Sequence, residues 1–179
     1  MATTKDRALR AAVEEVGEHG IRALTHARVD ARAGLPKGST SNWFRSRATL
    51  LAGVMKHLAD EERAMAPAQE VNTPGDLTDF LCAMVETASG PAAARTRVRL
   101  ALSLEAAHNP DLLVPLQTER AAFVAWTEDL LGRVGAQHPR QAARALLACC
   151  NGLLFHKLTV EPDAEVREVI ERCVRACLD

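Results

Sequence analysis

Apolar residues recur at the spacing of an α-helix along almost the whole chain. One such stripe consists of Leu9, Ala12, Val13 and Val16. A second stripe begins at Leu50, and further patterns predict long helices over residues 76–89, 92–108, 111–134, 140–160 and 163–178. No segment alternates convincingly with the period of two that a strand requires, and aromatic and β-branched residues are sparse. The sequence therefore predicts an all-α protein.

Length and composition limit the class of protein further. With 179 residues, the chain is one domain or a small domain fused to a larger one. No apolar run reaches the roughly 18 residues that a membrane-spanning helix needs, and the charged first residues lack the apolar core of a signal peptide. We therefore expect a cytoplasmic protein with no membrane partner.

The cysteines argue against a disulfide framework. Their number is odd, the first residues do not resemble a secretion signal, and no Cys-x-x-Cys spacing indicates a zinc site. We expect mostly reduced, buried thiols, with redox sensing as the alternative, at Cys82, Cys149, Cys150, Cys173 and Cys177.

Between residues 20 and 50 the long helical pattern gives way to short pieces. Thr25 follows apolar Leu24 and precedes Val29, a pattern typical of an N-cap with a hydrophobic staple, for a helix that runs to about residue 33. Gly34 then supplies a left-handed turn position. Pro36 opens a second short helix through about Asn42, and Ser46 is the expected N-cap of the next long helix. Two short helices joined by such a turn describe a helix-turn-helix.

The charge of the chain is divided unevenly. The whole chain carries a formal charge of −1, but residues 1–50 hold nine basic and five acidic side chains. Their net charge is therefore +4, which leaves −5 for the remainder. A small basic region on a larger acidic body favours a nucleic-acid partner for the N-terminal part.

The second short helix contains side chains suited to reading DNA. In helix-turn-helix proteins, residues near the start of this helix reach base edges in the major groove. Asn42 is suited to a bidentate contact with adenine, Gly38 to a close approach of the DNA backbone, and Trp43 to a phosphate. Arg47 would be a phosphate clamp beside the groove. The alternative is a solvated polar turn on a helical bundle.

Residues 8–58 resemble the DNA-binding domain of TetR/AcrR-family transcriptional regulators. The run from Ala33 to Leu51 carries the resemblance, with an Ala-Gly pair, Lys-Gly, an aromatic doublet, Ser-Arg and a Leu-Leu pair. The resemblance implies about nine helices, with a three-helix DNA-binding domain at residues 1–46 and a helical ligand-binding and dimerisation domain at residues 47–179. The implied DNA contacts are Thr25, His26, Arg28, Lys37, Gly38, Ser39, Thr40, Ser41, Asn42, Trp43 and Arg47.

Four positions depart from the pattern of that family. Ser41 stands where the family usually has Tyr, and Pro36 stands where a Ser N-cap is frequent. Thr40 replaces a common Leu, and Asp30 replaces a usual Ala and adds a charge beside the turn. These departures affect the operator sequence and individual contacts, while the motif itself is intact.

For the body, the resemblance implies a cavity among the middle helices and a homodimer through residues 140–178. Residues 146–155 are apolar around most of a helix, as a helix between a pocket and a partner would be. Two-fold symmetry predicts a palindromic operator with recognition helices about 34–36 Å apart. A small-molecule effector would occupy a pocket whose candidate residues, with simple core packing as the alternative, are Phe80, Met84, Glu105, Phe123, Trp126, Asn151 and Phe155.

Catalytic and metal-binding patterns are weak. The pair Glu105-x-x-His108 has the spacing of a helical di-iron ligand pair, but such sites need two copies and two further Glu. We therefore expect no metal, no cofactor and no enzymatic activity. The sequence favours a ligand-responsive DNA-binding repressor. The alternatives are a non-specific architectural DNA-binding protein and a helical enzyme with an accessory N-terminal domain.

Overall fold

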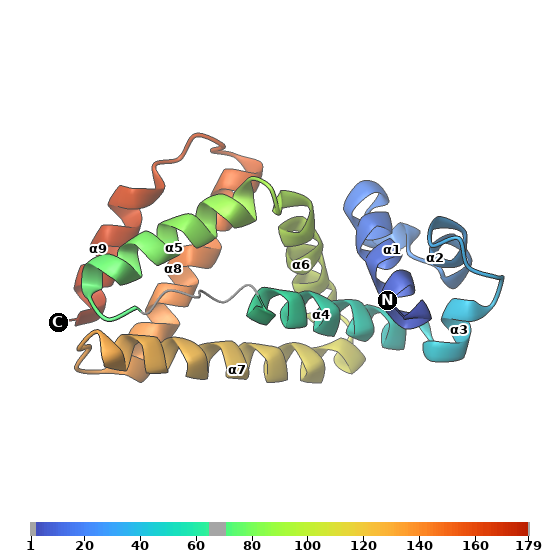
Figure 1. The fold of residues 1–179 in the computed structure, drawn as a ribbon, viewed down its shortest axis with the longest axis horizontal. Coiled ribbons are helices and arrows are strands. Elements are labelled where there is room, and N and C mark those ends of the chain that lie inside the picture. Colours follow the sequence, from blue (N-terminus) through green and yellow to red (C-terminus); the bar gives the residue numbers. More distant parts are fainter. Residues whose placement is uncertain (1–2, 65–70, 179) are drawn as a thin grey trace. The chain divides into compact units, whose positions relative to one another are not determined.

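The computed structural model describes residues 3–64 and 71–178, and within them it contains nine α-helices and no strand (Figure 1). This confirms the predicted all-α fold, and most helix ends fall within three residues of those expected. The helices are α1 (Thr4–His19), α2 (His26–Arg32), α3 (Ser39–Trp43), α4 (Arg47–Ala64), α5 (Pro74–Ser89), α6 (Ala93–Ala106), α7 (Pro110–Arg133), α8 (Pro139–Thr159) and α9 (Val166–Leu178).

The chain divides into two compact units. The first unit is Met1–Met65 with Ala94–Glu119, and the second unit is Ala66–Ala93 with Arg120–Asp179. The first unit extends beyond the expected DNA-binding domain of residues 1–46 because α4 and α6 complete its core. The boundary at residue 46 is a functional division and stays a prediction.

The core of the first unit lies where α1 packs against α4 and the helix-turn-helix. Ala8 and Ala12 of α1, Val29 of α2, and Leu50 and Leu51 of α4 are all fully buried in it. The predicted caps are confirmed. The hydroxyl of Thr25 accepts the amide of Arg28 at the start of α2, and Ser46 and Thr49 cap α4 reciprocally. Local capping and apolar spacing together therefore fix these helix starts.

The turn between α2 and α3 depends on two glycines in the left-handed region. Gly34 has φ +60°, which confirms the predicted turn position. Gly38 has φ +91°, so a helix cannot run from Pro36 through this residue as the sequence suggested. Pro36 instead accepts the amide of Ser39 in a turn, and α3 begins only at Ser39. The recognition helix is thus five residues long.

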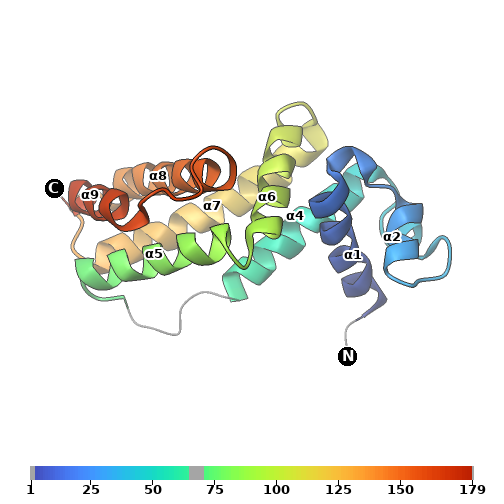
Figure 2. The ribbon, with the colours of Figure 1, turned by 90° about the horizontal axis from the view of Figure 1, so that it is seen from above.

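The second unit consists of α5, α8, α9 and the C-terminal part of α7. Helices α8 and α9 lie side by side, and both pack on α5 (Figure 2). Leu77, Leu131, Leu146 and Ile170 are fully buried in its core. The unit also contains an exposed salt bridge, in which Arg167 of α9 pairs with Asp79 of α5 at 2.7 Å. Burial of long apolar faces therefore stabilises this unit.

No helix in the described part of the chain is long and apolar enough to cross a membrane.

Candidate functional site

The start of the recognition helix α3 is hydrogen-bonded to the carboxylate of Asp30 on α2. Asp30 Oδ2 accepts the amide of Gly38 at 2.8 Å, and Oδ1 accepts both the amide of Thr40 at 2.8 Å and its hydroxyl at 2.6 Å. Asp30 and Thr40 are both buried. Burial alone would raise the pKa of Asp30, but the bonds from Thr40 and Gly38 outweigh it and hold the pKa below its ordinary value. The group is therefore an ionised carboxylate at neutral pH.

The burial of Thr40 argues against one of the predicted DNA contacts, while the contact predicted at Gly38 stays a prediction. Thr40 is 0% exposed and its hydroxyl is bonded to Asp30, so its side chain is part of the core instead of the reading surface. Gly38 is required by its backbone conformation and donates its amide to Asp30. No pattern in the sequence indicated directly that these residues serve the fold of α3.

Other polar residues of the recognition segment remain at the surface. Lys37 and Asn42 are exposed, and Trp43 is 56% exposed. The hydroxyls of Ser39 and Ser41 are partly buried and donate to the carbonyls of Pro36 and Gly38. Those oxygens keep acceptor capacity, so they can accept hydrogen bonds but have used their donors.

The predicted contacts on α2 take part in local bonds. Thr25 caps the helix and is exposed. His26 donates from Nε2 to the carbonyl of Phe44 at 2.7 Å, which ties the start of α2 to the end of α3. Arg28 is exposed to solvent, and its guanidinium pairs with the carboxylate of Glu15 on α1.

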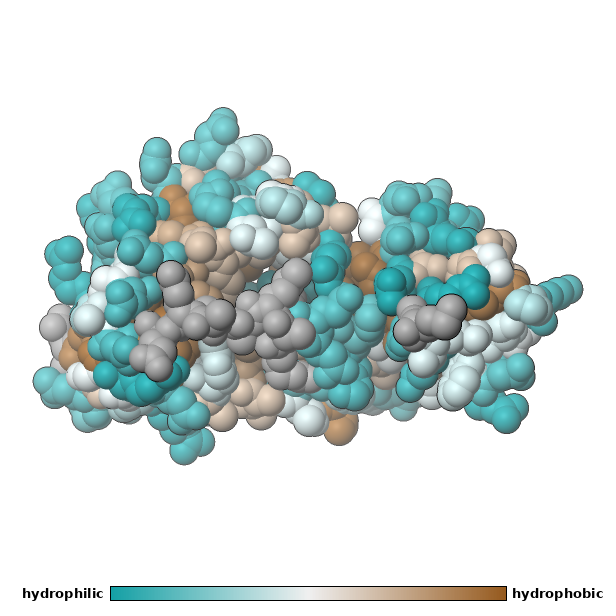
Figure 3. Space-filling model, in the orientation of Figure 1, coloured by the Kyte–Doolittle hydropathy of each residue, from teal (hydrophilic) through white to brown (hydrophobic). Residues whose placement is uncertain are grey.

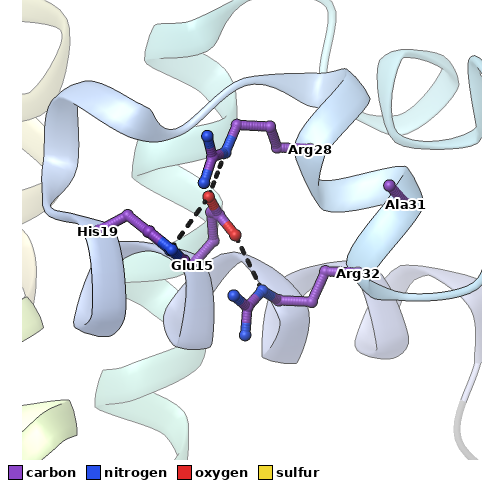
Figure 4. Close-up of a pocket in the computed structure, with 5 residues that line it drawn as sticks. All are labelled: Glu15, His19, Arg28, Ala31 and Arg32. Atoms are coloured by element: carbon purple, nitrogen blue, oxygen red, sulfur yellow. Dashed lines mark hydrogen bonds and ion pairs between the residues drawn. The ribbon is translucent and has the colours of Figure 1, made fainter.

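Glu15 is the centre of a charged cluster that joins α1 to α2. Its carboxylate lies between Arg28 and Arg32, with His19 Nδ1 3.5 Å away (Figure 4). These residues and Ala31 line a shallow depression of about 320 Å³. Burial would raise the pKa of Glu15, but the hydrogen bonds from the two arginines leave it lowered. The side chains that line the depression therefore form an ion cluster in which the arginines are paired with the carboxylate of Glu15.

Arg47 lies at the start of α4 and is bonded within the first unit. Its Nη2 donates to the carbonyl of Ile21 at 2.7 Å, and its Nη1 lies 3.3 Å from Glu105 Oε1 of α6. Its side chain is 41% exposed. The same guanidinium is thus available to solvent and is already oriented by two protein partners.

Four residues outside the predicted site support or extend this surface. Asp30 and Glu15 are the buried acids described above, and Arg7 of α1 donates to the carbonyls of Ala33 and Gly34 at the end of α2. Arg45 is exposed shortly after Trp43. The high density of basic residues between residues 20 and 50 includes Arg45, but spacing alone did not separate it from the others. Figure 3 shows hydrophilic side chains over much of α1 and α2.

The candidate pocket residues do not form one set. In the second unit, the rings of Phe80 and Trp126 meet edge to face at 5.9 Å, and Phe123 stacks on Trp126 at 5.3 Å. Met84 packs against the same core, and Asn151 is partly buried on α8. Phe155 is 49% exposed and lies against His156. Glu105 belongs to the first unit, where it pairs with Arg47, because its position near the end of α6 faces α4.

The cysteines lie in the second unit and are free thiols. Cys150 and Cys177 are buried, while Cys82, Cys149 and Cys173 are partly exposed. Burial raises the pKa of Cys150 to about 12 and also raises the pKa of Cys173. Within residues 3–64 and 71–178, no group of three or more His, Cys, Asp or Glu side chains is arranged to hold a metal ion.

Comparison with known proteins places this architecture in a family. The family model described as "Tetracyclin repressor-like, C-terminal domain" matches residues 72–179, which is more than half of the chain. No curated protein matches the chain significantly.

Three solved structures share the fold over nearly their whole length. A transcriptional regulator from Rhodococcus sp. Rha1 has a TM-score of 0.82 at 20% identity, covering 98% of this chain and 96% of that one. A TetR-family member from Streptomyces coelicolor A3 has a TM-score of 0.81 at 23% identity, covering 99% of each chain. The multidrug binding protein EbrR complexed with ethidium has a TM-score of 0.79 at 24% identity, covering 98% of each chain.

The fold and the helix-turn-helix define a DNA-binding transcriptional regulator. The chain belongs to the TetR family of such regulators, as its sequence resemblance implied.

Proposed function

We propose that this protein is a ligand-responsive repressor. It binds a palindromic operator as a homodimer and releases it when a small molecule occupies the body. The observation that carries the proposal is the start of the recognition helix, which Asp30 holds: α3 presents Asn42 and Trp43 to solvent, and the turn before it exposes Lys37. This arrangement matches what major-groove recognition requires: polar side chains on a short helix held in a fixed orientation.

In this proposal the DNA contacts have different roles. Asn42 reads a base edge, and Lys37, Trp43 and Arg45 contact phosphates or bases beside it. Thr25, Arg28 and Arg47 lie outside α3 and contact phosphates. Ser39 and Ser41 accept hydrogen bonds from DNA through their hydroxyl oxygens. His26 ties the start of α2 to the carbonyl of Phe44 through Nε2, and the partly exposed remainder of its ring contacts DNA. Thr40 and Gly38 act through the fold of α3.

The homodimer forms through α8 and α9. Ala145, Ala148, Gly152 and Phe155 are exposed along one face of α8, at spacings of three and four residues. On α9, Val169 is an exposed apolar residue. Small and apolar side chains on an exposed face suit the close approach of a second copy, because they allow helices to pack without burying charge.

The effector binds beside the aromatic cluster of Phe80, Phe123 and Trp126. Faces of aromatic rings favour flat or cationic ligands. EbrR was solved with ethidium and with proflavin, so planar aromatic cations are the first compounds to test. Trp43→Phe leaves Trp126 as the single tryptophan. In this variant, ethidium should quench the fluorescence in a saturable way. Quenching that is only linear in ethidium would exclude a site at this cluster for such cations.

The DNA-binding proposal is tested by fragment selection. Genomic fragments retained by the purified protein are sequenced, and the strongest is compared with a random duplex of equal length. We expect at least about 1,000-fold tighter binding to the selected duplex, and an effector should weaken it by about 5–150-fold. Equal affinity for the two duplexes would contradict the proposal and favour a non-specific architectural role.

A further inference from the structure

The bonds within the recognition helix α3 are too few to fix its orientation. It has five residues, far fewer than the roughly 12–15 that an isolated helix needs to be even marginally stable. Its N-cap is Gly38, which has no side chain to bond the first amides. Something outside the helix must therefore orient it.

Asp30 supplies the bond to the Thr40 amide that an N-cap side chain would make, and it also bonds the amide of the N-cap residue Gly38. Its two oxygens accept the amides of Gly38 and Thr40, and the Thr40 hydroxyl adds a third bond. Each bond involves an ionised carboxylate, so it is shorter and stronger than one between neutral groups. We define these three residues as the Asp30 anchor.

The anchor is buried as well as bonded. Asp30 is 3% exposed, so water does not replace the lost bonds when a partner is removed. A buried carboxylate is costly unless its oxygens are satisfied, and here both oxygens have donors. The geometry of the helix start is thus tied to the placement of one charge on α2.

We propose that Asp30 is a positioning residue for operator recognition, acting as an N-cap supplied from α2 that sets the direction in which α3 presents Asn42 and fixes the turn that exposes Lys37. This inference rests on the proposed DNA-binding function and deepens it. The two family departures at residues 30 and 40 form a single unit. A carboxylate and a hydroxyl take the place of the Ala and Leu that are usual in that family, and a polar anchor replaces an apolar contact.

The experiment compares four variants with the wild-type full chain. These are Asp30→Ala, Asp30→Asn, the double variant Asp30→Ala/Thr40→Leu, and the control Asp6→Ala. Asp6 caps α1 by accepting the amide of Thr3, so its removal deletes the same charge and a capping carboxylate away from α3. Three quantities are measured: the melting temperature, the hydrogen exchange of the Gly38 and Thr40 amides, and the ratio of affinities for the selected and random duplexes.

For Asp30→Ala we expect faster exchange of both amides and a specificity ratio that falls by at least about 10-fold. Binding to the random duplex should change by less than about 3-fold, because phosphate contacts do not require one orientation of the helix. Asp30→Asn keeps an acceptor for Thr40 but presents an NH₂ group to the Gly38 amide, so exchange at Gly38 should rise more than at Thr40. Asp6→Ala should leave the exchange of both amides and the specificity ratio unchanged.

The double variant separates positioning from simple packing. The leucine introduced at position 40 restores apolar packing beside the alanine introduced at position 30, so the melting temperature should recover. The lost specificity for the selected operator should not recover with it. Recovery of both quantities, or equal losses on the selected and random duplexes for Asp30→Ala, would overturn the proposal.

The exchange measurement distinguishes a failure of the anchor from a failure of the proposed function. Unchanged exchange of the Gly38 and Thr40 amides in Asp30→Ala would overturn the proposal, and that result is independent of DNA. If the wild type shows no preference between duplexes, the proposed function fails and operator positioning by Asp30 fails with it. The exchange data then decide whether Asp30 still holds the start of α3.

Discussion

The helix-turn-helix and the second unit are stabilised in different ways. Around α2 and α3, charged side chains bond to backbone groups and to one another: Asp30 to α3, Arg7 to the end of α2, and Glu15 to two arginines. In the second unit, long helices meet through apolar side chains such as Leu146 and Ile170. The first region thus depends on a few directional bonds and the second on buried area.

The difference follows from helix length. Helices of five to seven residues bury few apolar side chains, so directional bonds must fix their orientation. Helices of 13–21 residues such as α8 and α9 bury whole apolar faces and need no such bonds. A short helix that must keep one direction benefits from directional bonds, whereas long helices are oriented by the apolar faces that they bury. Substitutions in the two regions should therefore have effects of different kinds.

The largest effect is expected in the apolar unit. Leu146→Ala removes a fully buried side chain, so it should reduce the free energy of unfolding by about 3–5 kcal/mol. Urea denaturation at a fixed protein concentration measures the loss. Val160→Ala, at an exposed position, should change it by less than about 0.5 kcal/mol. A loss below about 1 kcal/mol for Leu146→Ala would show that buried area does not dominate this unit.

The next effect concerns the charged cluster. Glu15→Gln should cost about 1.5–3 kcal/mol at neutral pH, because it weakens bonds from two arginines. The folded protein lowers the pKa of Glu15, so its contribution is fully present above about pH 4.3 and is lost as the pH falls through the lower folded pKa. The variant should therefore show a flatter decline of stability in acid.

Stability measured by denaturation at several pH values checks this prediction. Glu14→Gln is the matched control, because its carboxylate lies 3.8 Å from Arg32 and is largely exposed. An identical acid profile for wild type and Glu15→Gln would show that the cluster does not hold α2 on α1.

A third prediction concerns base reading. Asn42→Ala should lower discrimination by about 1–3 kcal/mol at particular base pairs and leave the melting temperature nearly unchanged, since the side chain is exposed. Competition binding with single-base operator variants measures this. Asn109→Ala, at the start of α7, is the control and should leave base preference intact. A uniform loss across all sequences would mean that Asn42 contacts the backbone and does not read a base.

The smallest effect is expected for Arg47. Arg47→Ala should weaken binding to all duplexes alike and reduce the salt dependence of binding by about 0.9, the contribution of one phosphate contact. Affinities at several salt concentrations measure the slope. Glu105→Gln frees the guanidinium from its ion pair and should not reduce the slope. If Arg47→Ala lowers only the melting temperature, Arg47 serves α4 and α6 and does not touch DNA.

Much of the fold could be predicted from the sequence. Helical spacing, the caps at Thr25 and Ser46 and the turn at Gly34 are local signals, and each is confirmed. The predicted start of α3, at Pro36 instead of Ser39, was wrong because the pattern did not show that Gly38 adopts a left-handed conformation. Local signals thus predict the helices well but misplace a helix start where a glycine adopts a left-handed conformation.

The site was less predictable, because its key contacts are long-range. Asp30 and Thr40 were recognised as departures from the family pattern, but their pairing ten residues apart depends on the turn between them. The bond between Arg47 and Glu105 spans 58 positions, and no spacing rule anticipates it. The contacts at Lys37, Asn42 and Trp43 follow from a local motif, and they stay predictions until DNA binding is measured.

A footprint on the selected operator tests the central claim most directly. A homodimer that presents two anchored recognition helices should protect two half-sites related by two-fold symmetry, with centres about 10–10.5 base pairs apart or a multiple of that spacing. Protection should be lost from both half-sites together on addition of an effector. Uniform protection without a repeated half-site, or protection of a single unsymmetrical site, would contradict the claim that this chain is a dimeric, operator-specific repressor.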